Sequence, residues 1–360
     1  MPDHDEGKES HAGRIVTFYS FKGGTGRTMA LANVAWILAA NGKRVLIADW
    51  DLESPGLHRF FQPFMDADVS GKPGIIDFIR RYEWAAKEEA VRFESTGISG
   101  TQAARDEMTL LIGRHISQVS HYALPVNWPF LDGAIDFLTP GKQGNGVYEL
   151  TLSALDWDTL YDTLGGAEFF DALRAHLKNA YDYVLIDSRT GLSDIADICT
   201  LHLPDTVVDC FTLSTQSIEG AARIAKQIQH YTERDITILP VPMRIDHAQR
   251  ANVLAGLQLA EFLFEGLPAG MPEPERGQYW TEVEVPYRSA YAYEETLAAF
   301  GDQPGSADSL LPAYERITAR ITENTITTLP PLDERLRLRT RLKFARTALP
   351  GPSSTRNRSE

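Results

Sequence analysis

The stretch RIVTFYSFKGGTGRT, residues 14–28, contains the pattern that decides the fold. Its first half has the β-branched and aromatic residues typical of a buried strand. Its second half, FKGGTGRT, holds three glycines, which allow positive φ and let backbone N–H groups curl around an anion. The apolar pattern MALANVAWILAA, residues 29–40, follows at once and predicts a helix whose positive end faces the loop. Strand, glycine-rich loop and helix in this order indicate a phosphate-binding site.

Five further strand-like runs continue the alternation of strands and helices. Several are apolar at every position, which is typical of strands buried on both faces of a parallel sheet. We therefore expect a doubly wound α/β fold: a mostly parallel sheet with helices on both faces. Ligands of such sheets bind at the carboxyl ends of the strands. The runs are RVLIAD (44–49), AIDFL (134–138), YVLID (183–187), TVVDCFTL (206–213) and ITILPV (236–241).

Composition excludes several classes of protein. The 360 residues carry a net charge of −14, which disfavours binding of nucleic acid or an anionic membrane over the whole surface. Two cysteines, Cys199 and Cys210, are too few for a disulfide framework or a cysteine-built metal site and favour a reducing compartment. The longest apolar stretch, residues 29–40, is far shorter than the ~20 residues of a spanning helix. We expect a cytoplasmic protein.

Carboxylates follow two of the predicted strands. DWDLESPGL, residues 49–57, ends the second strand-like run, and YDYVLIDSRTG, residues 181–191, contains the fourth. Carboxyl ends of parallel strands meet at one edge of a sheet, so these carboxylates are expected near the glycine-rich loop. The hydroxyl of Thr28 and these carboxylates are oxygen ligands of the kind Mg²⁺ prefers.

The loop resembles the deviant Walker A motif KGGxGK[ST] of the ParA/MinD superfamily of ATPases, with Arg27 where the motif has its second lysine. Residues 49–57 resemble the family's switch I, and residues 181–191 resemble its Walker B and switch II. The resemblance covers about residues 14–300 and implies a P-loop NTPase fold with ATP and Mg²⁺ as ligands. Two intervening segments also resemble the family, GIIDF (74–78) and DFLTPG (136–141).

The resemblance implies a role for each matched residue. For Mg²⁺ it implies Thr28 as a ligand, with Asp187 and Asp49 acting through bound water. It implies Asp51 as the carboxylate that orients the attacking water, and Lys22 as a cation that reaches the phosphates of the partner in an ATP-dependent homodimer. The expected phosphate-binding residues are Lys22, Gly23, Gly24, Thr25, Gly26, Arg27, Thr28 and Met29.

Three arginines leave alternatives open. Arg27 is a catalytic candidate because it keeps the positive charge of the family's lysine, but its planar fork cannot overlay an ammonium, so slow hydrolysis is expected. Arg189 is either a γ-phosphate sensor or the partner of a nearby carboxylate. Arg244 lies where the family packs the adenine and is either a base or ribose contact or an ordinary surface arginine.

These features favour a MinD/ParA-like ATPase that dimerises with ATP and recruits an unidentified protein partner. The first alternative is an ATP-gated scaffold with little or no hydrolysis, acting in a bacterial signalling or conflict system. A second is a small-molecule ligase or a kinase, which is less favoured because no C-terminal tyrosine cluster follows Tyr314. The helical insertion expected at about residues 80–130 is the candidate partner surface.

The two ends of the chain differ from its body. We expect a disordered leader (1–13), the ATPase domain (14–300), C-terminal helices (301–349) and a disordered tail (350–360). Residues 331–360 carry a net +5, and Leu338, Leu342, Ala345 and Leu349 recur at helical spacing. This basic helix is expected to dock on the acidic body or a partner. Contact with a membrane, giving a membrane-peripheral location, or with nucleic acid is the alternative.

Overall fold

A computed structural model describes residues 12–65, 69–143, 146–191, 193–231, 234–303 and 305–347. Its eight strands form one sheet in the order β3-β4-β2-β5-β1-β6-β7-β8. Only β3 pairs antiparallel among these neighbours, which confirms the predicted mostly parallel sheet. The strands are β1 Arg14–Tyr19, β2 Arg44–Asp49, β3 Ala123–Pro125, β4 Ala134–Leu138, β5 Tyr183–Asp187, β6 Thr206–Phe211, β7 Thr237–Ile245 and β8 Val285–Pro286.

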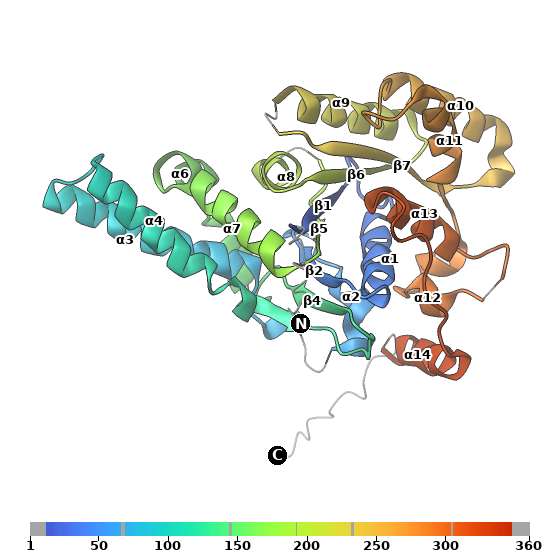
Figure 1. Ribbon diagram of the computed structural model, residues 1–360, viewed down its shortest axis with the longest axis horizontal. Coiled ribbons are helices and arrows are strands. Elements are labelled where there is room, and N and C mark those ends of the chain that lie inside the picture. Colours follow the sequence, from blue (N-terminus) through green and yellow to red (C-terminus); the bar gives the residue numbers. More distant parts are fainter. Residues whose placement is uncertain are drawn as a thin grey trace, which may run out of the picture.

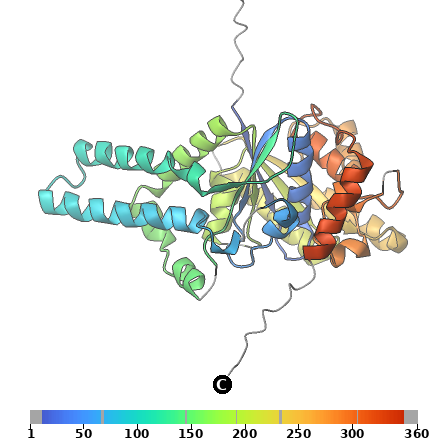
Figure 2. The same cartoon turned by 90° about the horizontal axis from the view of Figure 1, so that it is seen from below.

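Helices cover both faces of the sheet, with α1 and α13 on one side and α7 on the other (Figures 1 and 2). In the described residues the α-helices are α1 Arg27–Ala40, α2 His58–Phe61, α3 Ile75–Thr96, α4 Gln102–Ile116, α5 Val147–Ser153, α6 Trp157–Thr163, α7 Gly166–Ala180, α8 Asp194–Asp197, α9 Thr215–Tyr231, α10 Arg250–Leu263, α11 Glu273–Glu282, α12 Ala298–Gly301, α13 Leu311–Ile321 and α14 Glu334–Thr347. None of the helices in these ranges is long and apolar enough to cross a bilayer.

The strands form two hydrophobic cores, one on each face. In β2, Val45 and Ile47 pack into the core shared with α1, while Leu46 and Ala48 pack into the core shared with α3 and α7. Successive side chains of a strand point to opposite faces, so a run that is apolar at every position is buried on both sides. This alternation is the physical reason why the doubly wound class could be predicted.

Helices α3 and α4 form a hairpin that projects from the body (Figures 1 and 2). Its base is anchored by Tyr82, which stacks on Phe169 with ring centroids 4.2 Å apart and donates to the Leu164 carbonyl at 2.6 Å. The expected insertion at residues 80–130 is therefore helical only in part, since the hairpin begins at residue 75 and the edge strand β3 follows it. An edge strand of three residues is too short to be predicted from periodicity.

Helix α14 docks on the body, but not through the predicted apolar stripe. Leu338 and Leu342 are 47% and 60% exposed, whereas Arg337, Thr340 and Phe344 are buried. Arg337 donates to the carbonyls of Phe300 (3.2 Å) and Asp302 (2.6 Å). A buried arginine therefore contacts the body, whereas the sequence predicted that leucines would do so. The side chain of Ala345 and the residues Leu349 and 350–360 lie outside the described part of the chain, as do residues 1–11 of the leader.

Candidate functional site

The glycine-rich loop, residues 20–26, connects β1 to α1 at the carboxyl edge of the sheet. Gly24 and Gly26 have φ of 75° and 96°, a left-handed conformation that favours glycine. Gly26 precedes the first turn of α1, where no side chain of the described residues caps the helix and no acidic residue is present. The free N–H groups and the dipole of α1 therefore remain available to an anion.

Two carboxylates lie side by side at the ends of neighbouring strands. Asp49 on β2 and Asp187 on β5 occupy paired positions of the sheet, and both are buried. Asp49 accepts hydrogen bonds at 3.2 Å from the backbone N–H groups of Asp51 and Leu57. Burial and the neighbouring charge of Asp187 raise the pKa of Asp49 well above its usual range. The structure thus brings together the carboxylates that the sequence placed near the loop.

Arg27 lies between the carboxylates of Asp187 and Asp51. Its Nε donates to Asp187 Oδ1 at 2.6 Å, its Nη2 donates to Asp51 Oδ2 at 2.9 Å, and its Nη1 donates to Ser20 Oγ at 3.3 Å. The arginine is only 5% exposed. Burial opposes its charged form, but the two carboxylates outweigh burial and raise its pKa, so the guanidinium stays charged. The side chain predicted to contact phosphate instead bridges two acidic segments.

Lys22 and the residue before it connect the loop to α9. Lys22 Nζ donates to Gln216 Oε1 of that helix. Phe21 packs against Gly220, where a Cβ would lie 2.0 Å from the Phe21 ring, and Arg223 stacks over the same ring at 5.2 Å. The position of the start of the loop is therefore set by close contact with α9 as well as by the conformation of the loop glycines.

The oxygen atoms around Thr28 fit a magnesium ion that is also bound to phosphate. Asp187 Oδ2 is buried and has no hydrogen-bond partner among the described residues. Burial raises the pKa of Asp187, although the charge of Arg27 and the nearby Thr28 side chain act to lower it. No group of three or more His, Cys, Asp or Glu side chains within the described ranges is placed to hold a metal ion. Mg²⁺ commonly uses one or two protein ligands together with water and phosphate oxygens, and this site offers that number.

A small cavity of about 80 Å³ lies between the loop and the C-terminal part of the domain. Arg244, at φ 58°, closes one side by donating to the Gly24 carbonyl at 2.8 Å and stacking over Tyr287 at 4.8 Å. A non-glycine residue at positive φ persists only where its surroundings hold it, and such residues cluster at ligand sites. The cavity is lined by Thr25, Gly26, Met29, Met243, Arg244, Val285, Pro286, Tyr287, Arg288, Tyr291, Ala292, Leu310 and Tyr314.

Arg244 and Met29 were predicted from the sequence, but the tyrosines of this cavity were not. Tyr287 and Tyr291 follow β8, a strand of two residues with no recognisable motif. The one available signal was the apolar dipeptide Val285-Pro286 ahead of the two tyrosines.

For Arg189, the structure shows the carboxylate alternative, because Arg189 Nη2 lies 2.8 Å from Glu53 Oε2.

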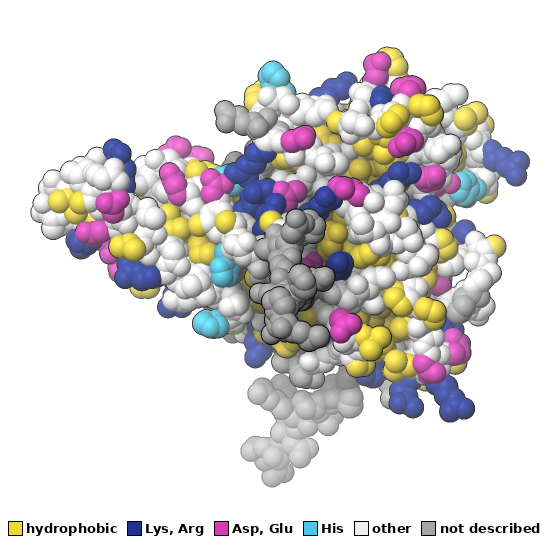
Figure 3. All heavy atoms as spheres, in the orientation of Figure 1, with side chains coloured by type: hydrophobic (Ala, Val, Ile, Leu, Met, Phe, Trp, Pro, Cys, Tyr) yellow, Lys and Arg dark blue, Asp and Glu magenta, His cyan; other side chains and the backbone are white. Residues whose placement is uncertain are grey.

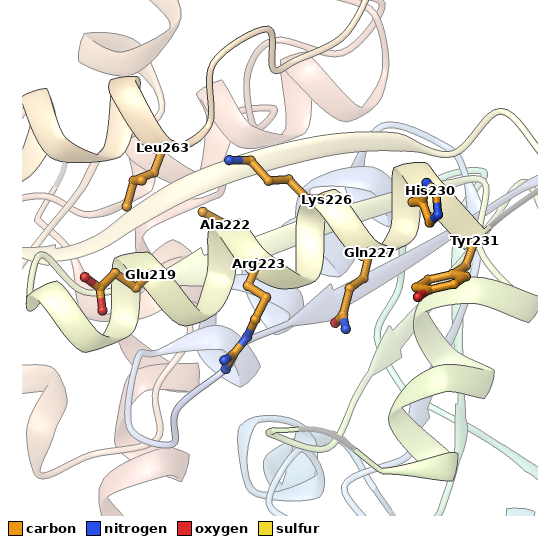
Figure 4. Close-up of a pocket in the computed structure, with 8 residues that line it drawn as sticks. All are labelled: Glu219, Ala222, Arg223, Lys226, Gln227, His230, Tyr231 and Leu263. Carbon is orange, nitrogen blue, oxygen red and sulfur yellow. The ribbon is translucent and has the colours of Figure 1, made fainter.

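A second cavity, of about 390 Å³, runs along α9 (Figure 4). Leu263 of α10 lines it from one side, and the other lining residues belong to α9. Arg223 belongs both to this groove and to the contact with Phe21, so the groove and the loop share one helix. The lining residues are Glu219, Ala222, Arg223, Lys226, Gln227, His230, Tyr231 and Leu263.

Residues 16–297 match the CobQ/CobB/MinD/ParA nucleotide binding domain. The fold is similar to septum site-determining protein MinD from Pyrococcus horikoshii, solved with Mg-ADP, at 15% identity and a TM-score of 0.52 over 86% of this chain and 96% of that one. It is also similar to apo McdA from Cyanthece, at 14% identity and a TM-score of 0.51 over 86% and 98%. No curated protein has a significantly similar sequence.

Proposed function

The chain belongs to the CobQ/CobB/MinD/ParA nucleotide binding domain family, and from this premise we propose that it binds ATP with Mg²⁺ and acts as a slow ATP-hydrolysing switch. ParA/MinD proteins are ATPases. One observation carries the proposal: the uncapped start of α1, the buried carboxylate cluster and the cavity beside Arg244 meet at the carboxyl edge of one sheet. A nucleotide needs these three environments, for its phosphates, its cation and its base.

Each part of the nucleotide has a place in this proposal. Backbone N–H groups of residues 23–28 bind the β- and γ-phosphates, as they do in other glycine-rich loops. Thr28 and Asp187 would hold Mg²⁺, and the bound ion would supply positive charge at the phosphate oxygens. Arg244 and the neighbouring tyrosines bind the base or ribose. The cavity beside Arg244 is small, so the loop and Arg244 separate when the base enters.

Asp51 is the proposed catalytic carboxylate. It is 15% exposed at the side chain and lies at the same edge of the sheet as the loop, so a water molecule can reach it. Its hydrogen bond with Arg27 holds the carboxylate in one orientation. In phosphoryl transfer the protein mainly positions groups and stabilises charge, so an oriented carboxylate is what the reaction requires. Asp51→Ala is expected to abolish phosphate release and to retain nucleotide binding.

The ATP-bound form is proposed to be a homodimer in which Lys22 reaches the phosphates of the partner. Gly23 and Gly24 beside it are exposed, so this side of the loop is open to a second chain. Solution mass by light scattering, without nucleotide, with ADP and with ATP, tests the proposal. A doubling with ATP alone is expected in wild type and in Lys72→Ala, an exposed lysine outside the site, but not in Lys22→Ala. A constant wild-type mass in all three states contradicts the dimer.

The hairpin of α3 and α4 is the proposed surface for a protein partner. Trp84, Val91 and Leu110 are 72%, 66% and 65% exposed on it, and hydrophobic side chains lie there among charged ones (Figure 3).

The protein is proposed to be located in the cytoplasm. Contact with a membrane or nucleic acid is proposed only through α14, where Leu338 and Leu342 are exposed beside basic residues.

A second candidate function is the ATP-gated scaffold, and the contacts of Arg27 favour it. In this structure the guanidinium that replaces the family's lysine is held by the carboxylates of Asp51 and Asp187. Phosphate release measured on Arg27→Lys separates the two functions. A large gain over wild type supports the scaffold, and a loss assigns Arg27 to catalysis.

A further inference from the structure

We infer that Arg27 is a positioning residue that joins Asp51 to Asp187 and balances their charge, so that nucleotide binding depends less on Mg²⁺ than it would in an Arg27→Lys variant. This inference rests on the ATP site proposed above. It concerns the arginine clamp, by which we mean Arg27 with its three partners Ser20, Asp51 and Asp187.

The clamp connects three separate segments through one side chain. Ser20 follows β1, Asp51 follows β2, and Asp187 ends β5. Each of the three guanidinium nitrogens donates to a different partner, at 2.6, 2.9 and 3.3 Å. Because the guanidinium is planar and its donors diverge in fixed directions, contact with one partner fixes the geometry toward the others. The position of Asp51 is therefore tied to the end of β5 before any nucleotide binds.

A lysine could not replace these contacts. Its ammonium is one point charge at the end of a flexible stem, whereas the clamp uses three nitrogen atoms. An Arg27→Lys side chain that contacts Asp187 leaves Asp51 without its charged partner, and the reverse choice leaves Asp187 buried and unpaired. Removing one partner of a buried charge is costly because the remaining charge stays desolvated. A bound metal ion would then supply the positive charge that offsets the unpaired carboxylate.

The remaining charges explain why the arginine competes with a metal. Asp49, Asp51 and Asp187 lie in one cluster, and Asp49 is held by backbone N–H groups. Arg27 takes Asp187 Oδ1 and leaves only Oδ2 without a partner among the described residues. A carboxylate that already shares its charge with a guanidinium attracts a divalent cation less strongly. The clamp thus supplies within the chain part of the positive charge that Mg²⁺ would bring.

The test compares nucleotide affinity with and without metal. The dissociation constant of ADP is measured by calorimetry with excess Mg²⁺ and again with EDTA, and the ratio of the two values is the readout. We expect a ratio of only a few-fold for wild type and a ratio roughly tenfold larger for Arg27→Lys. The matched control is Arg174→Lys, the same chemical change at an arginine that pairs with Asp205 and donates to the Leu203 carbonyl, ahead of β6 and away from the loop. Its ratio is expected to equal that of wild type.

The outcomes separate this inference from the proposed function. If neither wild type nor Arg27→Lys binds ADP or ATP under either condition, the ATP site itself is wrong. If both bind nucleotide and their ratios are equal, the site stands and the clamp has no effect on the metal. A larger ratio in Arg174→Lys than in wild type also overturns the inference, because the effect would then follow the loss of any arginine–carboxylate pair.

A second measurement on the nucleotide-free protein does not require Arg27→Lys to fold. The clamp holds the segment after β2, in which Glu53 is half exposed. Asp51→Asn removes the charged partner, so we expect a glutamate-specific protease to cut after Glu53 severalfold faster than in wild type. Cleavage after Glu323, which is 72% exposed, serves as the internal reference in the same digest. An unchanged ratio of the two cuts contradicts the clamp.

Discussion

Gly220→Ala tests whether the loop is seated on α9 as the structure shows. Helix propensity alone predicts a gain of about 1 kcal/mol in the free energy of unfolding, because alanine replaces glycine inside a helix. The structure predicts the opposite sign. A Cβ at residue 220 would lie 2.0 Å from Phe21 Cδ1 and 2.4 Å from Cγ, far inside normal contact, and Arg223 stacks on the same ring.

The magnitude follows from these two opposing effects. Overpacking a well-packed contact costs roughly 1–3 kcal/mol, which cancels or exceeds the propensity gain, so the free energy of unfolding should fall by up to about 2 kcal/mol. Because Lys22 follows Phe21, we also expect weaker nucleotide binding. The assay is urea unfolding of the nucleotide-free protein, with ADP affinity measured on the same preparations. A Gly220→Ala variant that is more stable than wild type by the full propensity gain of about 1 kcal/mol refutes the close contact.

Two further variants serve as controls for this experiment. Gly277→Ala in α11 is the matched control, since a Cβ there meets nothing within 4 Å, and we expect it to stabilise the protein by up to about 1 kcal/mol. In a Phe21→Ala background the ring is gone, so adding Gly220→Ala should no longer destabilise the protein. A penalty that persists without the ring would place its cause elsewhere on α9.

Three other predictions concern different parts of the molecule. Burial without a hydrogen-bond partner among the described residues raises the pKa of Asp209 to about 8, so the folded state holds a proton that the unfolded state releases. The free energy of unfolding should therefore fall as the pH rises from about 4 to about 8, by at most about 1.4 kcal/mol per pH unit. Asp209→Asn should remove this pH dependence, as measured by urea unfolding. Phe344→Ala should destabilise the protein by about 3 kcal/mol in the same assay, whereas the exposed Leu342→Ala should change stability by less than about 0.5 kcal/mol. Arg244→Ala should weaken ATP binding roughly tenfold and leave the affinity for inorganic tripolyphosphate unchanged, as measured by calorimetry.

Much of the fold was predictable because its strands are buried on both faces. The runs at residues 44–49, 134–138 and 183–187 were predicted to the residue, since apolar β-branched segments between polar turns have few alternatives. Strands β3 and β8 were missed because two or three residues carry no period. The face of α14 was also wrong: Leu338 and Leu342 follow the helical spacing, yet Arg337 and Phe344 fit the surface that the body presents.

The amino-acid sequence by itself determined the doubly wound sheet, the glycine-rich loop and the carboxylates at the strand ends, because these depend on local periodicity and on the order of segments along the chain. Tertiary structure alone decided what each charged side chain contacts. Arg27 lies 24 residues from Asp51 and 160 from Asp187, and no spacing rule shows that one guanidinium spans both. The cavity beside Arg244 likewise brings residues 25 and 287 together. Such contacts arise where distant segments meet at the edge of a sheet, and their geometry is set by packing and not by the sequence nearby.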